Sequence, residues 1–123
     1  MNPSDFLKKE LNLSDDQVVK FKELRKAHFQ KSKEEFKAIR NLKNEMLDAV
    51  SAESPDTLKA NMIAEQIGIK EANKEKLLVQ HYLKLQEVCT PEQRQKLERV
   101  FKKAMSRRKF RKGKRGKKKK EAE

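Results

Sequence analysis

Few residues of this 123-residue chain have the type and spacing that chemistry requires. His28 and His81 lie far apart in the sequence, and neither has a second histidine four residues away, which is the usual spacing of a metal site on a helix. Cys89 is the single cysteine, so the chain has no intrachain disulfide and no cysteine-based zinc cluster. We therefore expect no metal ligand and no cofactor, with both histidines partly buried on helix faces.

Motifs for catalysis are also missing from the sequence. It contains no glycine-rich phosphate loop, no nucleophile elbow and no metalloprotease His-Glu pair. The carboxylates alternate with Lys and Arg, as on solvated helix surfaces. We expect no catalytic residue and no enzyme activity. Cys89 is expected to be a small buried apolar residue, although a helix N-terminus beside it would lower the pKa of its thiol.

Composition favours a single domain of long helices. Charged residues make up 41% of the chain and hydrophobic residues 35%, with only three Gly and three Pro. Such a chain suits helices that each bury one stripe and complete their core by dimerising. The sequence therefore predicts an all-α fold, a long helical hairpin with short flanking helices, forming a thin homodimer.

Apolar periodicity places four helices. A short capped helix is expected within residues 2–11, where it folds back as a lid. Long helices are expected over 15–50 and 55–88, with Ser54 as the cap of the second and Pro55 at its first position. A fourth helix is expected from Pro91 to about Phe110.

Two helix starts carry the same capping pattern. Ser14 and Gln17 form one S/T-x-x-E/Q capping box, and Thr90 and Gln93 form the other, with Pro91 at the first helical position. In each box the hydroxyl accepts from a first-turn amide and the glutamine side chain reaches back to the cap.

This pair of boxes resembles the paired L-T-x-x-Q motifs of the Spy/CpxP family, periplasmic stress proteins related to the CnrX and ZraP metal-resistance proteins. Leu13, Ser14 and Gln17 match the first motif with Ser in place of Thr. Thr90 and Gln93 match the second, with Cys89 where the family has Leu. The resemblance implies a cradle-like dimer of thin helical subunits that holds unfolding proteins without ATP.

The helix expected over 55–88 has two apolar stripes on roughly opposite sides. One stripe is expected to pack on the helix over 15–50, and it contains Leu58, Met62, Ile69, Val79 and Leu83. The other stripe is expected to remain open as a dimer or client surface, and it contains Ile63, Ile67, Leu77, Leu78 and Leu85. An exposed patch of that size indicates a binding role.

The net charge of +13 is concentrated at the C-terminal end. Residues 107–120 contain eleven Lys or Arg and no acid, whereas residues 1–106 hold 21 basic and 17 acidic side chains. We predict a helical domain over 1–110 and a disordered basic tail over 111–123. Three roles stay open for this tail: contact with nucleic acid, contact with an anionic membrane, or a solubilising function.

These features leave three hypotheses for function. The resemblance implies a periplasmic holding chaperone for unfolded client proteins. It equally allows a regulatory or metal-stress sensor module acting on a membrane signalling partner. Independently of the resemblance, the basic tail would suit a small nucleic-acid-binding protein. The chain shows no signal peptide, so a cytoplasmic location is the alternative to the periplasm.

Overall fold

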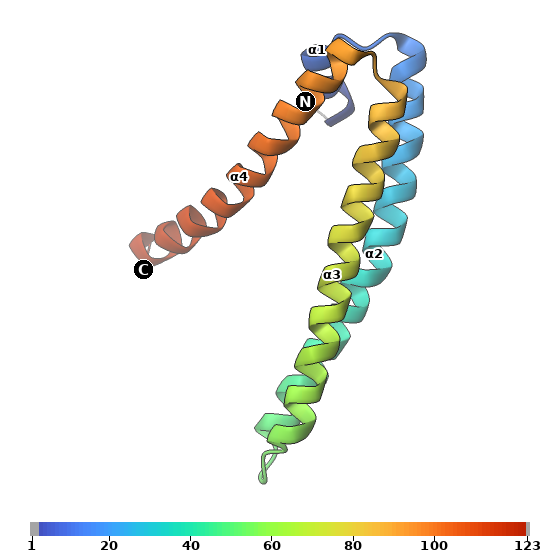
Figure 1. The fold of residues 1–123 in the computed structure, drawn as a ribbon. Coiled ribbons are helices and arrows are strands. Elements are labelled where there is room, and N and C mark those ends of the chain that lie inside the picture. The colour runs from blue at the N-terminus through green and yellow to red at the C-terminus, as the bar shows by residue number, and fades with distance from the viewer. Residues whose placement is uncertain (1–2, 123) are drawn as a thin grey trace. The chain divides into compact units, whose positions relative to one another are not determined.

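A computed structural model describes the backbone of residues 3–122 and the side chains of residues 5–106. The described residues form four helices joined by short connections, with no strand, which confirms the all-α fold. Its helices are α1 (Pro3–Leu11), α2 (Asp15–Ser51), α3 (Thr57–Val88) and α4 (Pro91–Ala122). Figure 1 shows α2 and α3 running side by side as a hairpin. Within the described residues, none of these helices combines the length and apolarity needed to cross a membrane.

Two compact units make up the chain. The first unit combines residues 1–18 with residues 86–123, and the second is the body of the hairpin, Val19–Leu85. In the first unit α1 lies against α4. Its buried apolar side chains include Leu11, Leu13, Cys89 and Leu97. The second unit is built from the facing sides of α2 and α3.

The connection from α1 to α2 is a tight left-handed turn. Asn12 has a φ of 55°, a conformation that asparagine tolerates better than most residues. The amide of Leu13 donates to the carbonyl of Lys8 over 3.1 Å, which is the long hydrogen bond of a Schellman motif. The side chain of Lys8 also pairs with Asp15 at 2.9 Å on the exposed surface. The turn therefore ends α1 and sets the start of α2 within three residues.

Two helix ends differ from the sequence prediction. Asp56, not Ser54, caps α3, because its carboxylate Oδ1 accepts from the amide of Lys59 at 3.0 Å. At the other end of the chain, α4 continues to Ala122 and does not stop near Phe110. The side chains of residues 107–123 lie outside the described part. The division into a domain over 1–110 and a basic tail over 111–123 thus stays a prediction.

The two stripes of α3 are the reverse of the sequence prediction. Ile63 and Leu85, assigned to an open surface, are 5% and 2% exposed and form part of the hairpin core. Their neighbours on that stripe, Ile67, Leu77 and Leu78, are half-buried. The outward face of α3, which we call the outer α3 stripe, contains Leu58, Met62, Ile69, Val79 and Leu83, each at least 51% exposed.

Polar pairs across the hairpin explain this choice of face. His28 of α2 stacks on His81 of α3, and Glu35 of α2 lies 3.6 Å from the ammonium of Lys70 of α3. Glu35 Oε2 is buried and has no hydrogen-bond partner in the described chain, so Lys70 is its electrostatic partner. Turning the other face of α3 inward would leave this carboxylate unpaired, at a high cost.

The apolar side chains of α2 are divided between the hairpin core and the solvent. Phe21, Ile39 and Ala49 are buried in the hairpin. Phe29, Phe36 and Leu47 are 64%, 52% and 57% exposed. They belong to a lateral face of α2 that is largely exposed.

Candidate functional site

The two capping boxes come together in the first unit. In the box that starts α2, the Ser14 amide donates to Gln17 Oε1 at 2.9 Å, and the Gln17 amide donates to Ser14 Oγ at 3.2 Å. In the box that starts α4, the Thr90 amide donates to Gln93 Oε1 at 2.9 Å, and the Gln93 amide donates to Thr90 Oγ1 at 3.3 Å. Both boxes therefore have the reciprocal geometry that the sequence predicts.

The two glutamine side chains then bond to each other. Gln17 Nε2 donates to Gln93 Oε1 at 2.8 Å, and Gln93 Nε2 donates to Gln17 Oε1 at 3.1 Å. The second hydrogen of each amide also has an acceptor: Gln17 Nε2 donates to the carbonyl of Val88 at 3.0 Å, and Gln93 Nε2 to that of Asn12 at 3.2 Å. Every hydrogen-bonding position of both amides is used.

The arrangement has a local two-fold character. Each glutamine donates to the carbonyl two residues before the other box's cap, Asn12 before Ser14 and Val88 before Thr90. This amide pair ties the start of α2 to the end of α3 and the start of α4. It has no free group to offer a substrate, so we interpret it as a structural clasp.

Cys89 lies beside this clasp as a buried residue, 7% exposed. Burial raises the pKa of its thiol, and the charge of Arg94 opposes this only in part. A helix N-terminus beside Cys89 would lower the pKa of its thiol, but the net effect of its surroundings is to raise it. A neutral buried thiol fits the reading of Cys89 as a small core residue.

His28 and His81 form a second feature, which the sequence did not predict as a pair. Their rings stack with centroids 4.4 Å apart and planes 9° from parallel. Ser32 Oγ lies 3.3 Å from His28 Nε2. Desolvation, the main cause, together with neighbouring His28, Arg25 and Lys84, lowers the pKa of His81 to about 4. Desolvation, with Lys31 as the lesser cause, also lowers the pKa of His28.

This geometry does not fit a chelated metal ion. A metal bound to imidazole lies in the plane of the ring, along the nitrogen lone pair. Two nearly parallel rings 4.4 Å apart cannot both direct a lone pair at one ion. Moreover, the side chains that the structure describes contain no group of three or more His, Cys, Asp or Glu placed to hold a metal.

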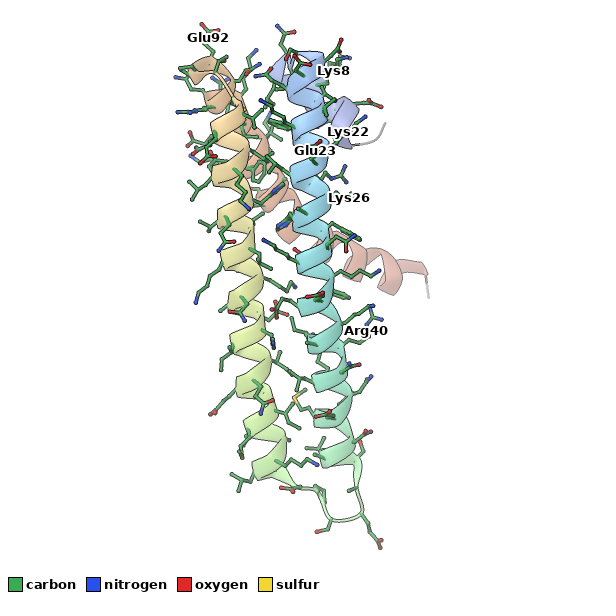
Figure 2. All side chains as sticks on the ribbon, turned by 90° about the vertical axis from the view of Figure 1, so that its right-hand side faces the viewer. Lys8, Lys22, Glu23, Lys26, Arg40 and Glu92 are labelled. Atoms are coloured by element: carbon green, nitrogen blue, oxygen red, sulfur yellow. The ribbon has the colours of Figure 1, made fainter. Side chains whose placement is uncertain are left out.

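A third feature is a basic-aromatic stripe on the lateral face of α2. Its members recur at alternating steps of three and four residues, and all are exposed. They are Val19, Lys22, Lys26, Phe29, Lys33, Phe36, Arg40, Lys43, Leu47 and Val50. Figure 2 shows Lys22, Lys26 and Arg40 projecting from this side of α2. Five of the ten positions are cationic and none is acidic, so the stripe suits an acidic partner with apolar groups.

Fold and site together define an all-helical hairpin protein whose helix starts are joined by paired glutamine capping boxes. A family model described as heavy-metal resistance matches residues 1–96, and the chain belongs to that family. The match extends over both motifs, Leu13–Gln17 and Thr90–Gln93. No curated protein and no solved structure shows significant similarity to the chain.

The clasp gives the first prediction. Gln17→Glu keeps an acceptor for the Ser14 amide but removes both donations, leaving the Val88 carbonyl and Gln93 Oε1 facing a carboxylate. We expect a loss of about 2 kcal/mol in the free energy of unfolding, measured by urea denaturation.

The control is Ser14→Ala, which removes one cap and should cost about 1 kcal/mol. If Gln17→Glu destabilises no more than Ser14→Ala, the cross-helix donations contribute nothing, and the clasp is only two independent caps.

The histidine pair predicts a pH dependence. Because the folded-state pKa of His81 is depressed below its unfolded value of 6.5, the unfolded chain binds more protons at pH 5. Stability is therefore fully present above about pH 6.5 and falls as the pH drops toward 4. Urea midpoints at pH 7 and pH 5 should differ less in His81→Phe, which keeps a ring but cannot titrate. An equal pH difference in both proteins would contradict this.

The ring geometry also predicts that the chain has no stoichiometric metal site. Calorimetric titration with zinc, copper, nickel and cobalt should show no tight binding. A micromolar site that disappears in His81→Ala would refute this expectation and show that the two rings rearrange around an ion.

Proposed function

We propose that this member of the heavy-metal resistance family is an ATP-independent holding chaperone that binds unfolding proteins on the basic-aromatic stripe of α2. The observation that carries the proposal is the interleaving of exposed phenylalanines with cations along this helix. Phe29 is 64% exposed and Phe36 is 52% exposed. Monomeric soluble proteins rarely leave such a contiguous face open without a use.

The stripe has two physical properties that a holding surface needs. Its cations attract acidic chains over distances of about a Debye length, 8–10 Å at ordinary salt. Its aromatic and aliphatic groups then supply apolar contact area that does not depend on a particular partner sequence. The guanidinium of Arg40 lies 5.2 Å from the centre of the Phe36 ring, and the ammonium of Lys74 lies 5.5 Å from it. These cation–π contacts hold the ring in place at the surface.

The proposed partners are unfolded client proteins, and the proposed location is the periplasm; both come from the resemblance to Spy/CpxP. Contact of the basic tail with nucleic acid or an anionic membrane stays a separate prediction, because the side chains of residues 107–123 lie outside the described part.

A second candidate is a regulatory module that acts on a membrane signalling partner during metal stress. Membership of the heavy-metal resistance family favours this candidate. Its metal-sensing form requires His28 and His81 to leave their stacked arrangement, because the present geometry does not fit an ion. The titration described above distinguishes it from a protein that acts by holding clients alone.

The holding function predicts that apolar and basic groups of the stripe act together. We expect Phe29→Ser with Phe36→Ser to raise about tenfold the concentration that halves aggregation of an acidic, thermally unfolding test protein, followed by light scattering. The fold should be unaffected, because both rings are exposed.

A matched pair of variants separates the stripe from net charge. Lys26→Glu with Arg40→Glu reverses two stripe charges, whereas Lys20→Glu with Lys37→Glu makes the same change in net charge at exposed positions of α2 off the stripe. The first pair should weaken protection strongly, and the second only slightly. Equal loss in both pairs, or full protection by the phenylalanine variant, would overturn the proposal.

A further inference from the structure

The core of the hairpin is divided into two separate blocks. At one end Phe21 of α2 and Leu85 of α3 are buried, and the buried side chains at the other end are Ile39, Ala49, Ala60 and Ile63. Between the blocks lies a stretch that we call the middle span, residues 22–38 of α2 and 64–84 of α3. Every side chain of the middle span is described, and none is buried. Apolar burial therefore holds the two helices together least firmly at their centre.

Polar contacts take the place of a buried apolar core in the middle span. The ammonium of Lys70 lies 3.6 Å from Glu35 Oε2, which is beyond hydrogen-bonding distance. This buried oxygen has no hydrogen-bond partner in the described chain. A desolvated ion pair of such geometry contributes little net stability. The stack of His28 on His81 is therefore important for keeping the helices together here.

Gly68 of α3 lies within the middle span and makes it easier to open. A Cβ added to Gly68 would meet no atom within 4 Å, so close packing does not require a glycine at this position. Glycine inside a helix is nevertheless destabilising relative to alanine, because it loses more conformational freedom on folding. Its presence lowers the free energy needed to open α3 locally.

We propose that the middle span is an acid-sensitive device, in which protonation of His28 and His81 separates α2 from α3 at their centre while both core blocks stay closed. In the closed span the two rings lie face to face with centroids 4.4 Å apart, so two imidazolium charges would repel each other directly.

The surroundings of the two rings add to this repulsion. The other charged groups that act on them are cations, Arg25 and Lys31 of α2 and Lys84 of α3. Ser32 Oγ, which lies 3.3 Å from His28 Nε2, is neutral and does not offset a positive charge. Separation of the helices brings both rings into water, where each is protonated without this repulsion.

The direction of the response follows from proton linkage. In the closed span the pKa of His81 is lowered to about 4, mainly by desolvation, whereas in water it returns toward 6.5. The open form therefore binds more protons than the closed form, and its population increases as the pH falls from about 6.5 toward 4. Above pH 6.5 the rings are neutral in both forms, so they favour neither.

Opening the middle span would enlarge the surface that holds clients. Ile67, Leu77 and Leu78 are half-buried on the side of α3 that faces α2. Separation from α2 makes the rest of their apolar area accessible to an unfolding protein. This consequence rests on the proposed holding function, whereas the pH response of the hairpin does not.

Amide hydrogen exchange on the full chain tests the opening, with each rate expressed as a protection factor so that the intrinsic effect of pH is removed. From pH 7 to pH 5, protection in residues 22–38 and 64–84 should fall by about tenfold or more, while protection in residues 42–49 changes less than about twofold. His28→Phe with His81→Phe keeps two rings that cannot titrate, so its protection should not depend on pH. An equal fall in all three ranges, or an unchanged response in the phenylalanine variant, would overturn the proposal.

A second pair of substitutions leaves both histidines in place. Lys31→Glu with Lys84→Glu puts a carboxylate near each ring, which favours the protonated rings in the closed span and should reduce the fall in protection to about threefold or less. Lys20→Glu with Lys37→Glu makes the same change in net charge at exposed positions at least two turns from His28 along α2, and it should respond to pH as the parent does. Equal responses of the two variants would assign the effect to net charge and overturn the proposal.

Protection of a thermally unfolding test protein, compared at the same pH, separates the consequence from the opening. The parent and His28→Phe with His81→Phe should protect equally at pH 7, and at pH 5 the parent should need about threefold less protein. If neither protein protects at either pH, the proposed holding function fails and the exchange result stands alone. If the middle span opens at pH 5 but the two proteins protect equally there, opening does not regulate holding, and this consequence is overturned.

Discussion

The mutual hydrogen bonding of Gln17 and Gln93 is the constraint on which the arrangement of the first unit depends. Each amide closes its own capping box and also donates to the carbonyl before the other box, so three helix ends are fixed by two side chains. A glutamate satisfies the first requirement of a capping box equally well. Only an amide carries donors as well as an acceptor, which gives a physical reason for glutamine at both positions.

Much of this junction could be predicted from the sequence, because capping is local. Ser14, Gln17, Thr90 and Gln93 are each within three residues of the groups that they cap, and the boxes have the expected geometry. The contact between the boxes spans 76 residues, and no local rule predicts it. The one available signal was that both boxes end in glutamine.

The hairpin shows where pattern reasoning fails. Both stripes of α3 have helical spacing and comparable apolar content, so periodicity could not decide which one packs on α2. The stripe that is buried against α2 lies next to two polar residues of α3, Lys70 and His81. Partners on α2, Glu35 and His28, make that face acceptable. Burying a polar residue costs free energy when it has no partner, and much less when a partner pairs with it. The residue pattern of one helix does not reveal a partner that lies on another helix.

The 3.5-residue spacing of the exposed stripes depends in turn on the contact between α2 and α3. In a straight helix a repeat of 3.5 residues drifts about 20° per heptad, so a stripe over residues 58–83 would turn well away from its starting side. When α2 and α3 wind around each other, their inner faces stay in register and each outer stripe keeps a constant direction. The basic-aromatic stripe of α2 and the outer stripe of α3 both follow this period. A substitution that loosens the His28–His81 contact or the Glu35–Lys70 contact would therefore change the direction of both exposed stripes at a distance, because it would change how α2 and α3 wind around each other.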